Sequence, residues 1–388
     1  MTRRTITVLG ATGSVGQSTL DLVGRSPDQF EVVALTAASR VAELADAAIR
    51  TGARLAVIAD EAKLPELRDR LANSDVKAAA GEEALSDAAS GGGEWVMAAI
   101  VGCAGLKPVM AAVTAGKTVA LANKEALVTA GALMTDAARQ AGAKILPVDS
   151  EHNAIFQCLA GSAIDDVARI VLTASGGPFR CKSLAEMKAM TPAQAVAHPN
   201  WSMGAKISVD SATMMNKGLE LIEAHHLFGL PGERIDIVVH PQSVVHSMVE
   251  YVDGSVLAQM GSPDMRIPIA HALAHPRRIA TPAERLDLVK AGRLDFEAPD
   301  EDRFPSLRLA REALEAGGAA SIVLNAANEV AVAAFLDGRI GFLDIAALVD
   351  KSLESQAGLA APRSVEEVLD IDRVTRQQAG MLIREQVA

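Results

Sequence analysis

The amino-terminal part of the chain alternates short aliphatic, β-branched runs with longer alanine-rich stretches of helical periodicity. Strands separated by helices of this length imply right-handed crossovers and a Rossmann-like, doubly wound parallel sheet. Strands are expected at 5–9, 31–35, 54–58, 96–101 and 118–121, and helices at 17–23 and 41–50. The Ser-Gly-rich segment 89–93 is expected to be a weakly ordered connector.

The pattern changes after residue 150. Polar, glycine-containing loops and histidines lie between strands such as 169–172 and 235–239, as expected of an α/β domain that carries reactive groups on its loops. Beyond a proline-punctuated connector, helices are expected at 306–315, 321–335, 342–354 and 365–385. We therefore predict an α/β chain with domains at 1–149 and 150–275, a connector at 276–300 and a C-terminal helical bundle at 301–388.

Composition narrows the function. A chain of 388 residues with 49% hydrophobic residues can build more than one core, and it has no apolar run that could cross a bilayer. Its three cysteines lack CxxC spacing, which favours a reducing, cytoplasmic setting over a disulfide framework or a zinc ribbon. The net charge of −11 disfavours nucleic acid as a partner. We expect a cytoplasmic enzyme that acts on a small molecule, with neither a membrane nor a nucleic-acid partner.

A glycine-rich turn follows the first predicted strand and opens the first helix, with glycines at 10, 13 and 16. Glycine in such a turn permits a tight bend, close approach of the backbone to a pyrophosphate, and close packing of helix on strand. The free N–H groups at the helix start then favour phosphate. The turn predicts a dinucleotide site, although tight strand-to-helix turns use glycine for structural reasons as well.

The end of the second strand separates NADP from NAD. NAD enzymes usually place a carboxylate there for the ribose 2′-hydroxyl, whereas this chain has Ala38, Ser39 and Arg40. A guanidinium can hold the 2′-phosphate of NADP through two hydrogen bonds, so the pattern favours NADPH. The alternative is that Arg40 only begins a solvated helix face.

Two carboxylates follow a short apolar strand at 146–148. Alternate residues of an extended segment point the same way, so Asp149 and Glu151 could converge on one cation. Carboxylate oxygens suit Mg²⁺ or Mn²⁺ better than zinc. The alternative is helix capping, in which Asp149 or Ser150 starts a helix that runs to Cys158.

A second polar cluster lies at 207–220, where we expect a helix with Asp210 or Ser211 near its cap. Asn216 and Glu220 stand four residues apart on one helix face, with Lys217 adjacent. Met215, Leu219 and Ile222 form the opposite, core-facing stripe. The polar face could be an ordinary solvated surface, but serine, asparagine and lysine near a helix start also hold phosphate.

Two loops could close around a ligand. The turn at 175–177, Ser-Gly-Gly, could direct its N–H groups at an anion or simply end a strand. The loop at 198–204 places Trp201 among polar residues, either as a surface contact or as a flap that excludes water from a reductive site. The other histidines lack the spacing of a zinc motif and are predicted to be structural.

Read together, these motifs resemble the 1-deoxy-D-xylulose 5-phosphate reductoisomerase family. The matching segments fall in order over nearly the whole chain: 10–16, 121–125, 149–153, 175–177, 198–204 and 210–220. The resemblance implies a homodimeric enzyme of non-mevalonate isoprenoid biosynthesis, with residues 1–149 binding NADPH and residues 150–275 serving catalysis and dimerisation. It also implies isomerisation and NADPH-dependent reduction of 1-deoxy-D-xylulose 5-phosphate to 2-C-methyl-D-erythritol 4-phosphate with Mg²⁺, Mn²⁺ or Co²⁺.

The resemblance assigns roles residue by residue. The implied metal ligands are Asp149, Glu151 and Glu220, which together with Lys124 form the catalytic set. The implied substrate contacts are Lys124, Ser150, Glu151, Ser175, His198, Trp201, Ser211, Asn216, Lys217 and Glu220. The implied cofactor contacts are Gly10, Thr12, Gly13, Ser14, Val15, Ala38, Ser39, Arg40, Asn123, Glu125 and Gly204.

The chain departs from the family at one point and leaves two rival functions open. The family usually has glycine and asparagine after the second strand, so Arg40 is expected to replace their contact with the 2′-phosphate. An aspartate-semialdehyde-type dehydrogenase shares the Gly-Ala-Thr-Gly turn, but it would need a catalytic cysteine with a partner histidine. A non-catalytic, NADP-sensing regulator would bind the cofactor without requiring a metal.

Overall fold

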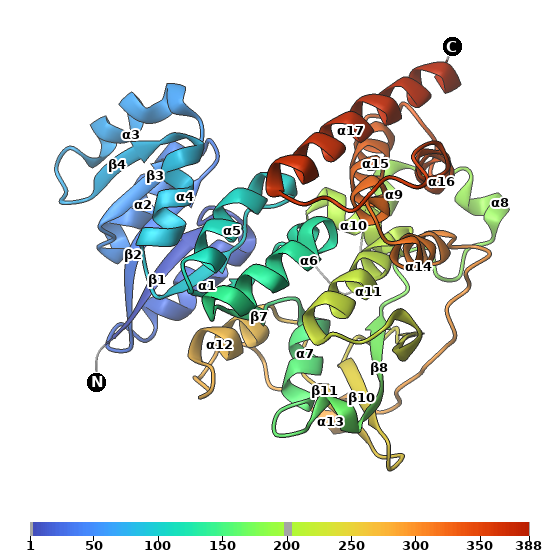
Figure 1. Cartoon of the computed structure of the whole chain (residues 1–388). Helices are drawn as coiled ribbons and strands as arrows, with labels where there is room; N and C mark the ends of the chain where they lie inside the picture. The colour runs from blue at the N-terminus through green and yellow to red at the C-terminus, as the bar shows by residue number, and fades with distance from the viewer. Residues whose placement is uncertain (1–2, 198–203, 388) are drawn as a thin grey trace. The chain divides into compact units, whose positions relative to one another are not determined.

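The computed structural model describes residues 3–197 and 204–387 (Figure 1). The chain packs as two compact units, each described here by itself. The first comprises the described residues of Met1–Ala126, Ala132–Asn153 and Asp264–Glu284; the second comprises those of Leu127–Gly131, Ala154–Pro263 and Arg285–Ala388. The four-part functional division expected from the sequence stays a prediction, since the packing units follow different boundaries.

The first unit is built on a seven-stranded sheet in the order β4-β3-β2-β1-β5-β6-β7, with every neighbouring pair parallel. Its central strands carry fully buried residues such as Ile6, Val8 and Leu35, because helices cover a parallel sheet on both faces. The strands are β1 (Arg4–Leu9), β2 (Phe30–Ala37), β3 (Leu55–Ile58), β4 (Lys77–Ala80), β5 (Trp95–Ala98), β6 (Thr118–Leu121) and β7 (Lys144–Pro147). The predicted Rossmann-like sheet is confirmed.

Helices connect these strands in the alternation that the sequence predicts. The connecting helices are α1 (Ser14–Gly24), α2 (Val41–Thr51), α3 (Leu64–Leu71), α4 (Gly81–Gly91), α5 (Leu106–Thr114) and α6 (Lys124–Ala141). Helix α7 (Ser150–Cys158) follows the last strand, and α12 (Arg266–Ala274) packs against α1. Helices α6 and α7 each contribute residues to both units.

Two local expectations in this unit are wrong. The segment 89–93 is no loose connector, because α4 runs through Gly91 and buries Leu85, Ala88 and Ala89 against the sheet. The predicted strand 96–101 ends at Ala98. In addition, β4 went unpredicted, because its Lys-Ala-Ala-Ala sequence has no β-branched residue.

The second unit contains a four-stranded mixed sheet in the order β11-β10-β8-β9. β8 (Val167–Ala174) pairs parallel with β9 (Ile235–Val239) and antiparallel with β10 (Val245–Tyr251), which pairs antiparallel with β11 (Val256–Met260). β8 and β9 match the predicted strands, whereas β10 and β11 were missed. His246, Ser247 and Glu250 interrupt the apolar pattern of β10, and Gln259 interrupts that of β11.

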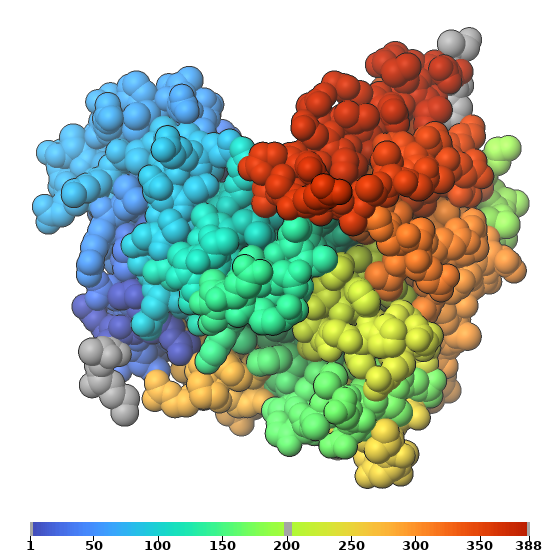
Figure 2. All heavy atoms as spheres, viewed as in Figure 1, coloured from blue at the N-terminus to red at the C-terminus, as the bar shows by residue number. Residues whose placement is uncertain are grey.

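Helices cover this sheet and build the C-terminal part of the chain. Helix α11 packs against β8 and β9 and also against α14, so one core joins the sheet to the C-terminal helices. The helices are α8 (Leu184–Met187), α9 (Pro192–Ala195), α10 (Ala205–Ala212), α11 (Met215–Phe228), α13 (Leu288–Ala291), α14 (Ser306–Ala316), α15 (Ala320–Leu336), α16 (Asp344–Ser355) and α17 (Val365–Val387). The last four confirm the predicted helical bundle, and Figure 2 shows them (orange to red) as one continuous surface.

One expectation about a helix start is corrected in this unit. Asp210 and Ser211 do not cap a helix; they lie in the last turn of α10. The break follows at Met214, whose φ of 64° is left-handed, and α11 begins at Met215. Sequence periodicity did not reveal this corner because no glycine or proline marks it. Among the described residues, no helix combines the length and the apolar character that crossing a membrane requires.

Candidate functional site

The predicted dinucleotide turn joins β1 to α1 in the geometry that its glycines require. Gly10 has φ 80°, and a Cβ at this position would lie 2.6 Å from the carbonyl oxygen of Ala99. The Gly10 N–H donates to Thr36 Oγ1 at 3.0 Å, which fixes the turn against the neighbouring strand. Gly13 is the N-cap residue of α1, and among the described residues no side chain caps this helix. The first N–H groups of α1 can therefore donate hydrogen bonds to a phosphate.

The residues expected at the 2′-phosphate lie together at the carboxyl end of β2. Ala38, Ser39 and Arg40 are all exposed, and Arg40 is the N-cap residue of α2. Sequence reasoning missed Lys63, in the 3-10 turn η1 (Glu61–Lys63) after β3, whose Nζ donates to the Ser39 carbonyl at 2.9 Å. Since β2 and β3 are parallel neighbours, the segments after both strands lie at the same edge of the sheet, and this could have pointed to Lys63.

Asn123 and Glu125 begin α6, at the carboxyl end of β6. The Asn123 side chain accepts from the Ala126 N–H and donates to the Gly102 carbonyl, both at 3.0 Å. It therefore caps α6 and holds the loop after β5 at the same time. Glu125 is buried, with an exposed fraction of 6%.

An ion pair links the ends of the neighbouring strands β6 and β7. Lys124 Nζ lies 2.7 Å from Asp149 Oδ2, and the two side chains are 8% and 15% exposed. On the other side, His152 Nδ1 lies 3.7 Å from Asp149 Oδ1, and His152 is fully buried. Sequence analysis assigned His152 no role. The Asp149 carboxylate thus lies between the Lys124 ammonium group and the His152 imidazole. This position favours its ionised form, which can bind a cation.

Residues 149–151 combine features of both interpretations of the sequence, helix capping and a cation site. Asp149 Oδ1 accepts from the Glu151 N–H at 3.4 Å, a long hydrogen bond of the helix-capping type. Ser150 donates from its hydroxyl to the Glu151 carboxylate. Asp149 and Glu151 are both partly exposed, so a cation can reach their carboxylates from solvent.

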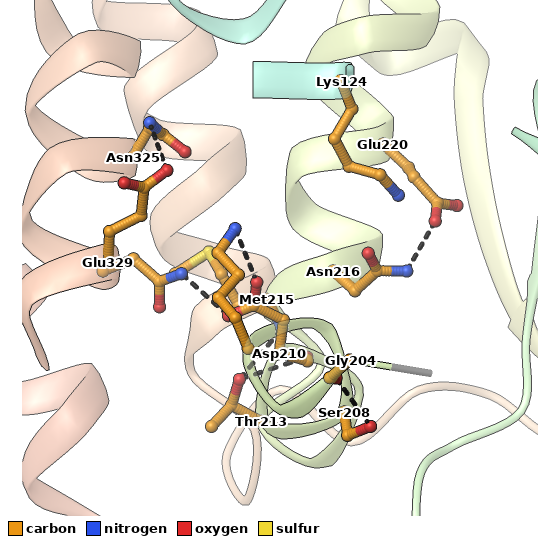
Figure 3. Close-up of polar contacts among 12 residues, drawn as sticks. Lys124, Gly204, Ser208, Asp210, Thr213, Met215, Asn216, Glu220, Asn325 and Glu329 are labelled. Carbon is orange, nitrogen blue, oxygen red and sulfur yellow. Dashed lines mark hydrogen bonds and ion pairs between the residues drawn. The ribbon is translucent and has the colours of Figure 1, made fainter. Parts of the chain in front are cut away.

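The polar cluster on α11 is buried rather than solvated. Lys217 and Glu220 are 3% and 1% exposed and form an ion pair on one face of the helix. Asn216 Nδ2 donates to Glu220 Oε1 at 2.6 Å, as Figure 3 shows. The predicted stripe of Met215, Leu219 and Ile222 is fully buried in the core of this unit. An ordinary solvated surface is therefore excluded.

The Ser-Gly-Gly turn after β8 lies against the end of α10. Gly176 and Gly177 have φ of 81° and 66°. A Cβ on Gly177 would lie 2.4 Å from the Ser211 carbonyl oxygen, and the Gly177 N–H donates to Ser175 Oγ at 3.2 Å. The fold thus brings the loop of Ser175 next to Ser211, which directly precedes the corner leading into α11.

Three predicted residues of the tryptophan loop have different outcomes. His198 and Trp201 lie outside the described residues. Gly204 is exposed and is the N-cap residue of α10, where its carbonyl accepts from the Ser208 N–H at 3.1 Å and from the Ser208 hydroxyl at 3.0 Å.

The cysteines and several histidines lie outside the predicted site residues, and burial shifts the pKa values of four of them. Burial raises the pKa of the Cys158 thiol to about 11, which disfavours a thiolate nucleophile. Cys103 is buried and Cys181 is exposed. Burial also lowers the pKa values of His226, His246 and His271 to about 4, as expected of histidines held neutral inside a protein.

A glycine turn that opens the uncapped helix α1 on a seven-stranded parallel sheet, with Lys124 and Asp149 ion-paired at the ends of β6 and β7, is the arrangement of a dinucleotide-dependent α/β oxidoreductase. Family models agree over three segments: 1-deoxy-D-xylulose 5-phosphate reductoisomerase at residues 6–131, its C-terminal domain at 145–228, and the DXP reductoisomerase C-terminal domain at 260–378. The chain belongs to the 1-deoxy-D-xylulose 5-phosphate reductoisomerase family.

Individual relatives match over almost their full lengths. The reductoisomerase of Zymomonas mobilis is 63% identical over 98% of both chains, and that of Sinorhizobium medicae is 56% identical over the same shares. The Zymomonas mobilis structure in complex with NADPH superposes with a TM-score of 0.94 at 61% identity, covering 98% of this chain and 99% of that one. A reductoisomerase in complex with NADPH, fosmidomycin and magnesium gives a TM-score of 0.94 at 45% identity, covering 98% of each chain.

Proposed function

We propose that this protein isomerises and reduces 1-deoxy-D-xylulose 5-phosphate to 2-C-methyl-D-erythritol 4-phosphate, using NADPH and a divalent cation, in non-mevalonate isoprenoid biosynthesis. One observation carries most weight: the ion pair of Lys124 with Asp149. It places the first residue of α6, beside the cofactor candidates Asn123 and Glu125, in contact with the first carboxylate of the metal candidates. Reduction at a metal-bound substrate needs that adjacency.

The residues of the first unit fit NADPH. The turn at Gly10 has no room for a side chain, and the uncapped start of α1 offers N–H groups for a pyrophosphate. We assign this contact to Thr12, Gly13, Ser14 and Val15. Arg40 and Lys63 bring two cations to the end of β2, where the 2′-phosphate of the cofactor requires positive charge. Asn123, Glu125 and Gly204 complete the assigned set.

The carboxylates fit a hard divalent cation such as Mg²⁺, Mn²⁺ or Co²⁺. We assign Asp149, Glu151 and Glu220 as ligands, because all are carboxylates whose positions match the family motif. When bound, the cation polarises the substrate's carbonyl and hydroxyl oxygens, and the nicotinamide supplies the hydride. Lys124 holds the Asp149 carboxylate in place and supplies a proton donor at its Nζ.

The phosphate end of the substrate is assigned to the second unit. Ser175, on the turn after β8, and Ser211, Asn216 and Lys217, on α10 and α11, provide hydroxyl, amide and ammonium donors. The Gly177–Ser211 contact brings these two segments together. Binding energy from this remote end orients the reacting carbons. His198 and Trp201 are assigned to the substrate by family resemblance, as are Ser150, Glu151 and Glu220. Fosmidomycin, bound in the related structure, is expected to compete for this site.

The direct test measures NADPH oxidation with 1-deoxy-D-xylulose 5-phosphate. We expect EDTA to abolish turnover and added Mg²⁺, Mn²⁺ or Co²⁺ to restore it. Full turnover in EDTA would overturn the metal assignment, and absence of turnover with every metal would overturn the function. A non-catalytic NADP-binding regulator predicts cofactor binding without any oxidation.

The rival dehydrogenase chemistry depends on a cysteine nucleophile. Replacing Cys103, Cys158 and Cys181 together with serine or alanine should leave turnover within about threefold of the wild type, because the proposed chemistry uses none of these thiols. Burial also raises the pKa of the Cys158 thiol to about 11, which disfavours a thiolate at that position. Complete loss of activity in a folded triple variant would favour the rival. A cytoplasmic homodimer is part of the proposal, to be tested by sedimentation and cell fractionation.

A further inference from the structure

Asp210 is a buried carboxylate on α10 that belongs neither to the proposed cofactor contacts nor to the proposed metal ligands. It is 1% exposed, and each of its carboxylate oxygens has a partner. Oδ1 accepts from Asn328 Nδ2 at 2.8 Å, and Oδ2 lies 2.9 Å from Lys206 Nζ. A carboxylate is costly to bury without such partners, so Asn328 and Lys206 determine where Asp210 lies.

Asp210 is joined to the corner between α10 and α11. Its carbonyl accepts from the Thr213 hydroxyl at 3.2 Å, and the same hydroxyl accepts from the Met215 N–H at 3.3 Å. Between them, Met214 adopts its left-handed conformation, which a residue with a side chain takes only when its surroundings impose it. Anchoring Asp210 therefore stabilises the corner from which Asn216 and Lys217 project.

The same anchor reaches the Ser-Gly-Gly turn. Ser211 follows Asp210 directly, and its carbonyl oxygen faces Gly177 at a separation that leaves no space for a Cβ. A shift of the last turn of α10 must therefore displace the turn that carries Ser175. The contacts form one continuous path from Asn328 through Asp210 and Ser211 to Gly177.

The starting point of this path is a C-terminal helix. Asn328 lies on α15, 118 residues after Asp210, and is fully buried. Asn325, one turn earlier on α15, is equally buried but donates to Glu329 at 3.4 Å, and Glu329 pairs with Arg376 of α17. Two neighbouring asparagines of equal burial thus have different partners: one reaches α10, and the other stays among the C-terminal helices.

We infer that Asp210 and Asn328 are positioning residues for the phosphate-binding loops, so that the C-terminal helices set the affinity for substrate. The inference rests on the proposed function, because it takes Ser175, Ser211, Asn216 and Lys217 as the phosphate contacts. Neither Asp210 nor Asn328 touches substrate. They act by fixing the end of α10, the corner at Met214 and the turn at Gly177.

The test compares Asn328→Ala with the matched control Asn325→Ala, measuring KM for substrate, kcat, melting temperature and the calorimetric Kd values for NADPH and fosmidomycin. We expect Asn328→Ala to raise KM for substrate and Kd for fosmidomycin about tenfold, with kcat within about threefold, since one hydrogen bond to a buried carboxylate is lost. The Kd for NADPH should not change, because its principal contacts lie in the other unit. Asn325→Ala should lower the melting temperature without raising KM.

A second variant keeps the test decisive if Asn328→Ala does not fold. Asp210→Asn preserves the shape of the side chain but turns an amide N–H toward Lys206, and it should raise KM in the same way. Equal KM values in both folded variants and in Asn325→Ala would overturn the inference while leaving the proposed function intact. Failure of the wild-type protein to turn over the substrate would instead refute the proposed function.

Discussion

Lys124 Nζ lies 2.7 Å from Asp149 Oδ2, in a contact that joins the start of α6 to the residue just before α7. Both side chains are largely withdrawn from water, so the pair is screened little by salt. A substitution at either residue leaves the other with an unbalanced charge. The pair thus couples the cofactor end of the proposed site to its metal end.

Asp149→Asn should remove an anionic ligand while preserving the shape of the side chain. We expect kcat to fall at least ~100-fold, with a melting temperature within a few degrees of the wild type. Steady-state kinetics at saturating Mg²⁺ and calorimetry measure the two effects. Asp46→Asn, at an exposed position of α2, is the matched control and should be silent. A fully active Asp149→Asn variant would leave Asp149 as a helix cap only.

Arg40→Glu should weaken the binding of NADPH far more than the binding of NADH. Loss of a charge-assisted contact with the 2′-phosphate should raise KM for NADPH by roughly 10- to 100-fold. Lys63→Ala should act in the same direction with a smaller effect, because its Nζ also supports the Ser39 carbonyl. Arg50→Glu, exposed in the last turn of the same helix, is the control. Equal changes for NADPH and NADH would show that Arg40 does not contact the 2′-phosphate.

Gly10→Ala should disrupt the dinucleotide turn. The left-handed conformation alone costs a non-glycine residue ~1–2 kcal/mol, and the clash with the Ala99 carbonyl adds to it. We expect a lower free energy of unfolding in urea and a higher Kd for NADPH. Gly24→Ala is the matched control on α1, since a Cβ there would meet nothing within 4 Å. Wild-type affinity in Gly10→Ala would refute the assigned turn.

Acid should destabilise the protein through its buried histidines. Burial holds the pKa of His226 at about 4 against an ordinary value of 6.5. Between these values the unfolded chain binds the extra proton, so the free energy of unfolding falls as pH drops from 6.5 toward 4, by about 1.4 kcal/mol per pH unit for each such histidine. Denaturation across this range should show a shallower slope for His226→Asn. An unchanged slope in a folded His226→Asn variant would show that this histidine does not contribute to the loss of stability in acid.

The geometry of the glycine turn and most of the elements could be predicted from the sequence because their signals are local. A strand that turns this tightly into a helix needs a residue with positive φ, and Gly10 supplies it. The strand-like and helix-like sequences on either side of Gly10 already mark this turn. The stripe of Met215, Leu219 and Ile222 likewise follows from helical periodicity alone. Strands β10 and β11 escaped prediction because polar residues interrupt their apolar patterns. The pairing of β10 with β8, and of β11 with β10, stabilises what local propensity does not.

Only the tertiary structure placed side chains from distant segments against one another. Lys63 beside Ser39, Lys124 beside Asp149 and Asn328 beside Asp210 are contacts across long stretches of chain, and no periodicity encodes them. Each depends on strand order or helix packing, which the whole core determines at once. The sequence by itself thus determined the cofactor turn, the layered α/β class and the residue types of the site. The fold determined which charges are buried together, because burial is a property of the packed chain and not of any one segment.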